Sequence, residues 1–361
     1  MLYPYKMMPI YKDYLWGGHN LRRLGKPAPE GQVAESWELS TISGSESKIA
    51  NGPLKGESLT EVIKRYGKLV LGEKFASDKI NAALPILLKF IDANDRISIQ
   101  VHPDDEYALE HENGKMGKTE MWYVIDAEPD ATVIHGFVEN YDKEKIRQAI
   151  LEEKHEGLYR EFKVKKGDVI FIPAGTVHAL NGGVVIAEIQ QHSDLTYRLF
   201  DYNRTDAAGK KRHLHIDKAL DVLSYNNRKA LFQGISVPCD KASIKYLAIS
   251  DYFCVKHIES KGMPIDMTAS GSFTAFMFIQ GEAEIISNNE KVHANSLETV
   301  FIPAFMGNYK LDGNFSALQI FIPNSVNEEY KFLIEKGISN KDIVNGIAGA
   351  ESLYSTLKTT A

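Results

Sequence analysis

One stretch of the chain, residues 167–204, constrains the possible folds more than any other. It reads GDVIFIPAGTVHALNGGVVIAEIQQHSDLTYRLFDYNR. The apolar run Val169–Ile172 lies between a Gly-Asp pair and Pro173, which predicts a short buried strand. Asn181–Gly183 is typical of a tight hairpin turn, so a second strand is expected to follow at once. Short strands joined by tight turns favour a β fold.

The second strand of this stretch changes character along its length. After an apolar start, every second residue is polar, and if the segment stays extended all of these side chains point to one face. The six polar residues are Glu188, Gln190, His192, Asp194, Thr196 and Arg198. Such a row is unusual for a core strand and indicates one wall of a polar cavity inside a β-barrel.

Bulk properties exclude several classes of protein. The chain has 361 residues, 43% of them hydrophobic and 25% charged, as in an ordinary soluble globular protein. A net charge of −6 argues against a nucleic acid or an anionic membrane as partner, although a pocket can still be locally positive. Two cysteines, Cys239 and Cys254, are too few for a disulfide scaffold. We find no signal-peptide pattern and no long apolar run, so we expect a soluble, cytoplasmic protein.

A short internal repeat suggests two domains of one design. VIFIPA at Val169–Ala174 recurs as TVFIPA at Thr299–Ala304, in both cases within a segment of β character. At the same offset His178 aligns with Asn308, so the second copy keeps the strand and loses the histidine. We therefore expect two β-barrels, of which only the first carries chemistry.

The expected fold is mainly β, with two barrel domains and a few peripheral helices. Residues 1–233 are expected to form the first, catalytic domain, and residues 234–324 a second, degenerate domain without a metal site. Residues 325–361 are expected to form a helical tail. Helical insertions into the first domain are expected at residues 56–84, 141–160 and 205–233.

Four side chains on expected polar strand faces suit a divalent transition metal. Gln100 and His102 stand two residues apart in the alternating segment RISIQVH, so both point the same way. Glu120 and His178 would arrive from neighbouring strands. Two imidazoles, a carboxylate and an amide oxygen suit such an ion, and the absence of cysteine ligands argues against a structural zinc site. Their order, on short strands separated by turns, fits a cupin metal site.

These motifs resemble those of class I mannose-6-phosphate isomerases in their shorter bacterial form. The resemblance covers most of residues 1–320. Its motifs are WGG at Trp16–Gly18, AESWE at Ala34–Glu38, SIQVHP at Ser98–Pro103, GKTEMW at Gly117–Trp122 and the whole of 167–204. The resemblance implies two cupin-type (jelly-roll) domains and one Zn²⁺ per chain, or another divalent transition metal. It also implies interconversion of mannose 6-phosphate and fructose 6-phosphate. We expect this small-molecule sugar phosphate to be the partner of a monomer or homodimer.

The resemblance further implies roles for individual residues. The zinc ligands would be Gln100, His102, Glu120 and His178. The catalytic residues would be Arg198, Lys118, Asp194 and Glu188. The residues that bind the substrate or its phosphate would be Lys89, Ser98, Arg204 and Trp16, with Trp16 in the pocket wall. Arg204 stands where longer members of the family carry lysine.

The implied reaction sets its own requirements. Aldose–ketose isomerisation moves a proton between C1 and C2 through a cis-enediol, which needs a base and stabilisation of negative charge on oxygen. Arg198 would orient the substrate and stabilise the enediolate. Lys118, Asp194 and Glu188 are all candidates for the proton transfer, and the sequence does not choose among them.

Two other functions stay open. The two histidines and one carboxylate would also hold iron in a metal-dependent oxygenase, although such an enzyme needs no basic cluster for a phosphate. A non-catalytic sugar-phosphate-binding cupin is the other alternative. Binding alone needs fewer ionisable groups than the row from Glu188 to Arg198 supplies.

Overall fold

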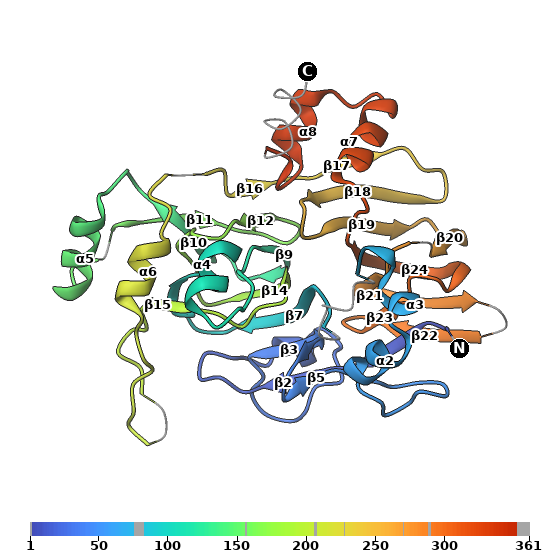
Figure 1. Ribbon diagram of the computed structural model, residues 1–361, viewed down its shortest axis with the longest axis horizontal. Coiled ribbons are helices and arrows are strands. Elements are labelled where there is room, and N and C mark those ends of the chain that lie inside the picture. The colour runs from blue at the N-terminus through green and yellow to red at the C-terminus, as the bar shows by residue number, and fades with distance from the viewer. Residues whose placement is uncertain are drawn as a thin grey trace.

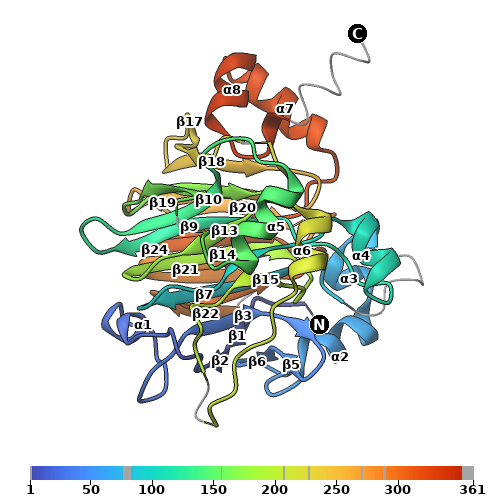
Figure 2. The same ribbon diagram turned by 90° about the vertical axis from the view of Figure 1, so that its left-hand side faces the viewer.

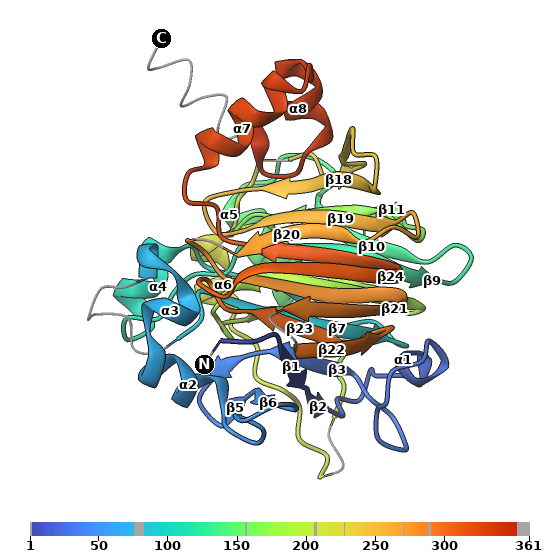
Figure 3. The same ribbon diagram turned by 90° about the vertical axis from the view of Figure 1, so that its right-hand side faces the viewer.

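The fold is built from layered antiparallel sheets that form two β-sandwiches, with short helices at their edges (Figure 1). It is seen in a computed structural model of the 361-residue chain. Figure 2 views the sheets from the side of the first sandwich and Figure 3 from the side of the second. The structure describes residues 2–75, 83–155, 157–205, 208–226, 228–269, 271–287 and 290–351.

The first sandwich consists of a five-stranded and a seven-stranded sheet. The five-stranded sheet has the order β11 (Tyr159–Lys163), β10 (Thr132–Phe137), β13 (His178–Leu180), β8 (Ile99–Val101) and β15 (Tyr197–Phe200). The seven-stranded sheet has the order β16 (Leu231–Phe232), β12 (Val169–Ile172), β9 (Glu120–Ala127), β14 (Val184–Gln191), β7 (Ile86–Ala93), β3 (Glu35–Leu39) and β2 (Ile10–Lys12).

The seven-stranded sheet is buried on both faces, which explains the long apolar runs of its central strands. On β14, Val184 and Ile186 belong to the core of the first sandwich. Val185 and Ala187, which alternate with them, belong to a second core between the two sandwiches. The polar end of β14 therefore lies inside protein, and its polar side chains need partners there.

The second sandwich is one ten-stranded sheet that folds over its own apolar core. Its main path is β17 (Ile235–Val237), β18 (Ala242–Ile249), β19 (Cys254–Ser260), β24 (Gly307–Phe321), β21 (Thr274–Ser287), β23 (Thr299–Ile302), β1 (Tyr5–Met8) and β6 (Lys48–Ile49). Off this path, β20 (Ile265–Ala269) pairs with β24 and β22 (Glu290–Asn295) pairs with β21. The repeated motif is a strand in both copies, as β12 and β23.

Helices occur in each expected insertion and in the expected tail. In the first insertion, Ser58 caps α2 by accepting a hydrogen bond from the backbone of Glu61 at 3.2 Å. Residues 76–82 of that insertion, residues 156, 206, 207 and 227 of the other two, and residues 352–361 of the tail lie outside the described part of the chain. The helices are α1 (Asn20–Arg23), α2 (Leu59–Tyr66), α3 (Lys68–Leu71), η1 (Glu73–Phe75), α4 (Asp105–His111), α5 (Lys143–Leu151), α6 (Ile216–Val222), α7 (Val326–Glu335) and α8 (Asn340–Gly346), and a two-stranded ribbon joins β4 (Thr41–Ile42) to β5 (Ser45–Glu46). Within the described ranges, no helix has the length and apolar character needed to cross a membrane.

Two expectations about the central stretch are wrong. Asn181–Gly183 does not close a hairpin, because β13 and β14 belong to different sheets and the turn carries the chain across the sandwich. The row of six polar residues is also interrupted. β14 ends at Gln191, and the chain leaves it when His192 donates a backbone hydrogen bond to Pro85 at 2.9 Å. It then reaches the other sheet as β15.

The two sandwiches do not divide cleanly at residue 233. The early strands β1 and β6 lie in the ten-stranded sheet, where β1 pairs with β23. The first helical insertion also binds the second sandwich, because Ala304 donates a backbone hydrogen bond to Val70 at 2.9 Å. The N-terminal segment therefore joins the two sandwiches. The expected domain boundary at residue 233 applies only to the part of the chain that follows this segment.

Candidate active site and metal centre

A row of three polar side chains crosses the five-stranded sheet. Gln100 on β8 lies opposite His178 on β13 and, on its other side, opposite Arg198 on β15. Opposite residues of antiparallel strands project to the same face, so all three point into the first sandwich. Arg198 thus reaches the site from another sheet than Glu188, although the two are ten positions apart in the chain.

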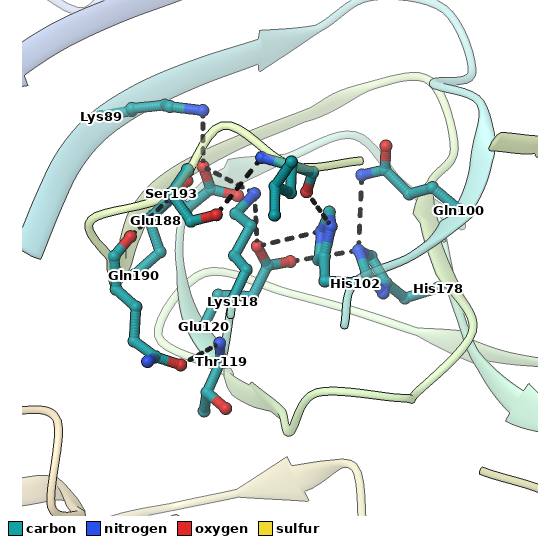
Figure 4. Close-up of polar contacts among 12 residues, drawn as sticks. Lys89, Gln100, His102, Lys118, Thr119, Glu120, His178, Glu188, Gln190 and Ser193 are labelled. Atoms are coloured by element: carbon teal, nitrogen blue, oxygen red, sulfur yellow. Dashed lines mark hydrogen bonds and ion pairs between the residues drawn. The ribbon is translucent and has the colours of Figure 1, made fainter. Parts of the chain in front are cut away.

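Three side chains that converge between the two sheets form a possible metal site (Figure 4). His102 follows β8, Glu120 begins β9 and His178 begins β13, and their ligand atoms all lie within 4.8 Å of one another. The Nε2 atom of His178 lies 3.2 Å from Oε1 of Glu120. The Nε2 atom of His102 lies 3.5 Å from Oε2 of the same carboxylate. The three residues are almost completely buried.

Backbone carbonyls orient both imidazole rings. The Nδ1 atom of His102 lies 2.7 Å from the carbonyl oxygen of Leu195, and Nδ1 of His178 lies 2.8 Å from that of Thr176. A carbonyl oxygen only accepts, so each Nδ1 carries the hydrogen and each Nε2 presents its lone pair to the centre of the site. This tautomer is the one in which Nε2 binds metals.

The residues present fit a metal ion. The Nε2 atom of His102 is buried and makes no hydrogen bond, which is costly unless a ligand occupies its lone pair. The amide of Gln100 lies 3.4 Å from Nε2 of His178, measured from its Nε2 atom. A half-turn of this amide presents its oxygen at the same place. Nitrogen and oxygen donors without thiolates suit a divalent transition metal in a site that keeps open positions.

The surrounding charges favour the ligand forms of these side chains. Burial, and then the charge of Lys118, lowers the pKa of His102 well below its usual value. Burial alone would raise the pKa of Glu120, but Lys118 and the two imidazoles together hold it well below the usual range. His102 is therefore neutral and Glu120 ionised at neutral pH.

A chain of alternating charges extends from the metal site along the seven-stranded sheet. Lys118 Nζ lies 2.8 Å from Glu120 Oε2 and 4.0 Å from Glu188 Oε2. Lys89 Nζ lies 3.1 Å from Glu188 Oε2 and 3.5 Å from Glu35 Oε2. All of these charged groups are largely buried, and Trp122 donates a hydrogen bond to Glu188 at 3.0 Å. Such a buried network beside a metal site is typical of acid–base chemistry.

Two of the predicted site residues do not join this network. Asp194 lies in the connection between β14 and β15, where its carboxylate pairs with Lys115 at 2.9 Å and its side chain is 47% exposed. Arg204 lies beyond β15 and pairs with Asp201 at 2.7 Å. Both positions were assigned through the family resemblance, and each side chain is instead paired with another charged residue outside the network.

Ser98 and Trp16 are both buried in the first sandwich. The Oγ atom of Ser98 lies 3.5 Å from Oε1 of Gln100, so it lies beside a metal-facing amide. The carbonyl oxygen of Trp16 accepts backbone hydrogen bonds from Asn94 at 2.9 Å and Asp95 at 3.1 Å, and its ring joins the first core. This placement agrees with a role for Trp16 in the wall rather than in the chemistry.

Glu35, in the motif AESWE, belongs to the charged network although its role was not predicted from sequence. Glu35 Oε2 accepts a hydrogen bond from the indole nitrogen of Trp37 at 2.6 Å and pairs with Lys89. The detectable signal was a carboxylate at the start of an otherwise buried strand. Such a residue needs a cation nearby, and Lys89 in the neighbouring apolar strand supplies it.

The fold and the convergent His–Glu–His set define a two-cupin protein with a site suited to a metal ion. Two family models match the chain, "Phosphomannose isomerase type I, catalytic domain" over residues 5–133 and "Mannose-6-phosphate isomerase, cupin domain" over residues 243–322. The chain belongs to the type I phosphomannose isomerase family.

Named relatives agree with this family. The probable mannose-6-phosphate isomerase GmuF of Bacillus subtilis is 36% identical over 317 residues, which cover 87% of this chain and 97% of the relative. Mannose-6-phosphate isomerase ManA of the same organism is 34% identical and covers 86% of this chain and 96% of its own. A crystal structure of the mannose 6-phosphate isomerase from B. subtilis superposes with a TM-score of 0.81 at 32% identity, covering 88% of this chain and 99% of that one.

Proposed function

We propose that this chain interconverts mannose 6-phosphate and fructose 6-phosphate. The observation that carries the proposal is the buried Lys118–Glu188–Lys89 network, which directly contacts the convergent metal ligands. Family membership supplies the substrate class. A site that only binds a sugar phosphate has no need for so many buried ionisable groups, because each must be stabilised by a partner.

We further propose that one Zn²⁺, or another divalent transition metal, is held by His102, His178, Glu120 and Gln100. The donor set and the unpaired Nε2 atom of His102 support this assignment. When bound, the ion would act as a Lewis acid that polarises substrate oxygens.

Glu188 is the candidate that we favour for proton transfer between C1 and C2. Its buried carboxylate lies between two lysine ammonium groups at 3.1 and 4.0 Å, and one of these lysines also pairs with Glu120 of the metal site. The carboxylate would take the proton from C2 of the aldose and return it to C1 of the cis-enediol. Asp194, half exposed and paired with a surface lysine, lacks this setting.

The remaining roles follow from position. Arg198, in register with Gln100, would donate hydrogen bonds to the developing enediolate oxygens. Lys118 would balance the added negative charge near the ligands. Lys89 is occupied by two carboxylates, so we assign it to holding Glu188 and Glu35 in place rather than to the phosphate.

A coupled assay tests the proposal by following fructose 6-phosphate formed from mannose 6-phosphate, with and without chelator. We expect turnover that the chelator abolishes and that zinc restores. Iron-dependent oxygen uptake would instead support an oxygenase, and tight sugar-phosphate binding without turnover would support a non-catalytic binding protein. The domain division at residue 233, the cytoplasmic location and the monomeric or homodimeric state stay predictions.

A further inference from the structure

The structure raises the question of which cation meets the phosphate of the substrate. Arg204, the residue expected from sequence, has both of its terminal nitrogens engaged within the protein. Its Nη1 atom donates to the backbone carbonyl of Arg96, and its Nη2 atom donates to Asp201 at 2.7 Å. Its guanidinium also lies over the ring of Tyr202 at 5.3 Å, and its side chain is only 16% exposed. Arg204 therefore has little capacity left for an incoming anion.

Arg212 binds the Asp201 carboxylate from the other side and has one nitrogen without a hydrogen-bond partner in the described part of the chain. Its Nε atom donates to Oδ2 of Asp201 at 2.6 Å, and its Nη2 atom donates to Oδ1. Its Nη1 atom makes no hydrogen bond within the described part of the chain, and the side chain is 36% exposed. This bidentate pairing fixes the plane of the guanidinium and leaves one edge available.

Asp201 accepts hydrogen bonds from two guanidinium groups. Its carboxylate is almost completely buried. Burial raises its pKa, but the hydrogen bonds from Arg212 and Arg204 outweigh this effect and lower the pKa overall. One negative charge thus anchors two positive ones, and the cluster carries excess positive charge toward any ligand.

The returning chain brings Arg212 close to β15. The segment after it runs beside β15, because His215 donates a backbone hydrogen bond to the carbonyl of Arg198 at 2.8 Å. Burial, and then the nearby charge of Arg212, lowers the pKa of Arg198. The Nε atom of Arg198 is buried and makes no hydrogen bond. Two adjacent guanidinium groups that each have an unused donor form a receptor for an anion.

The charges around Tyr14 agree with this placement. Burial and the charge of Glu35 raise the pKa of Tyr14, and the positive charges of Lys89, Arg198 and Arg212 oppose that rise. Tyr14 itself is partly exposed. The charge of Arg212 therefore acts on the same tyrosine as the charges of Glu35, Lys89 and Arg198.

The order of the side chains matches the length of the substrate. His178, Gln100 and Arg198 lie on three successive strands, which are about 4.8 Å apart from one to the next. Arg212 lines a pocket with Phe200, Asp201 and Arg204 at the end of β15, the strand that carries Arg198. A substrate whose C1 and C2 lie at the metal ligands would extend its phosphate, at the far end of a six-carbon chain, outward past Arg198.

We propose that Arg212, held by Asp201, binds the phosphate of the substrate. Arg204 acts indirectly, by helping to hold Asp201. This inference rests on the proposed function, because it names the residue that recognises the phosphate in that reaction.

Kinetics of Arg212→Gln and Arg204→Gln test the assignment. We expect Arg212→Gln to raise the KM for mannose 6-phosphate about 10- to 100-fold, as for a lost hydrogen bond to a charged group, with kcat within a few-fold of wild type. The inhibition constant of inorganic phosphate should rise in parallel, and Arg204→Gln should change both constants less. Arg212→Lys keeps the positive charge but not the planar guanidinium, so its KM should lie between those of Arg212→Gln and the wild type.

Either of two results overturns the inference. One is an unchanged KM and phosphate inhibition constant in Arg212→Gln; the other is a larger effect of Arg204→Gln. Thermal unfolding shows whether each variant is folded. If Arg212→Gln is not folded, the kinetics of Arg212→Lys test the inference instead. If the wild-type protein does not isomerise mannose 6-phosphate, the proposed function fails. The role of Arg212 is then judged by calorimetric titration with inorganic phosphate, which Arg212→Gln should weaken.

Discussion

Lys89 and Glu188 lie directly opposite each other on β7 and β14, with Nζ and Oε2 3.1 Å apart inside the first sandwich. Burial alone would lower the pKa of Lys89, but the charges of Glu188 and Glu35 outweigh it and raise the pKa. The lysine is therefore charged throughout the neutral range. Its positive charge lies directly against the carboxylate that we propose as the base.

Glu188→Gln removes the proposed base and keeps its shape. We expect kcat to fall about 100- to 10,000-fold, the usual contribution of a positioned base, while bound metal stays at the wild-type level. Asp194→Asn is the matched control, because its carboxylate is half exposed and paired with Lys115. Equal losses in the two variants, or a larger loss in Asp194→Asn, would show that the base has been assigned to the wrong carboxylate.

His102→Ala and His178→Ala each remove one proposed metal ligand. We expect metal content and turnover to disappear together, with metal affinity reduced by more than the 10- to 100-fold typical of residues that only support a ligand. His293→Ala, which changes a half-exposed histidine of the second sandwich, serves as control. Elemental analysis of the purified variants decides the question, since full metal content in either of them contradicts the ligand assignment.

Arg198→Ala separates charge stabilisation from metal binding. Arg198 is in register with Gln100 but is not itself a ligand, so we expect metal content to be unchanged. Turnover should fall about 100-fold or more, as when a hydrogen-bond donor to a developing oxyanion is lost. Turnover close to that of the wild type would remove this arginine from the mechanism.

The convergence of His102, Glu120 and His178 was predictable from sequence because each stands in or beside a short strand with a clear pattern. His102 follows an alternating strand, and His178 follows the apolar run that becomes β12. The two copies of the repeated motif, β12 and β23, were predicted as strands for the same reason. A local pattern determines which way a side chain points. For these residues that direction was sufficient to predict that they face the interior of the first sandwich.

The pairing of strands could not be predicted in the same way. Asn181–Gly183 signals a reversal of the chain, but it carries no information on whether the next strand joins the same sheet. Here β14 finds its partners in β7 and β9, which are far away in sequence. For the same reason Arg212 could not be predicted from sequence. Its proposed role depends on the return of the chain to β15, and no local motif indicates that return.

A buried ion pair joins the first sandwich to the second. Lys26 Nζ lies 2.7 Å from Glu38 Oε1, and both side chains are 1% exposed. The lysine also donates to the carbonyl of Leu297 at 2.6 Å, and Thr299 on β23 donates to Glu38 at 3.1 Å. The network therefore ties β3 to a strand that is more than two hundred residues away in sequence.

Lys26→Met leaves the carboxylate of Glu38 buried without its cation. We expect the free energy of unfolding to fall by about 3–5 kcal/mol. Lys163→Met breaks a pair with Asp130 in which both side chains are more than three-quarters exposed, and it should cost less than about 1 kcal/mol. Urea unfolding of both variants at neutral pH measures the difference. Similar losses would show that the buried pair contributes no more than a surface one.

His135 gives the folded protein a defined sensitivity to acid. It lies on β10 opposite His178, its Nε2 atom is 2.9 Å from the carbonyl oxygen of Phe171, and its Nδ1 atom is buried without a hydrogen bond. Burial lowers its pKa to about 4. Because the unfolded chain binds a proton near pH 6.5, the unfolded state takes up more protons than the folded state between these two values.

Stability should therefore decrease as the pH falls from about 6.5 to about 4, and this contribution levels off below that range because both states are then protonated. The expected loss from this one residue is on the order of 3 kcal/mol. His135→Gln keeps a neutral donor for Phe171 and removes the titration, so the advantage of wild type over the variant should shrink by that amount on acidification. Urea unfolding with chelator in every sample measures it, and a difference that is constant with pH would rule out the buried neutral histidine as its source.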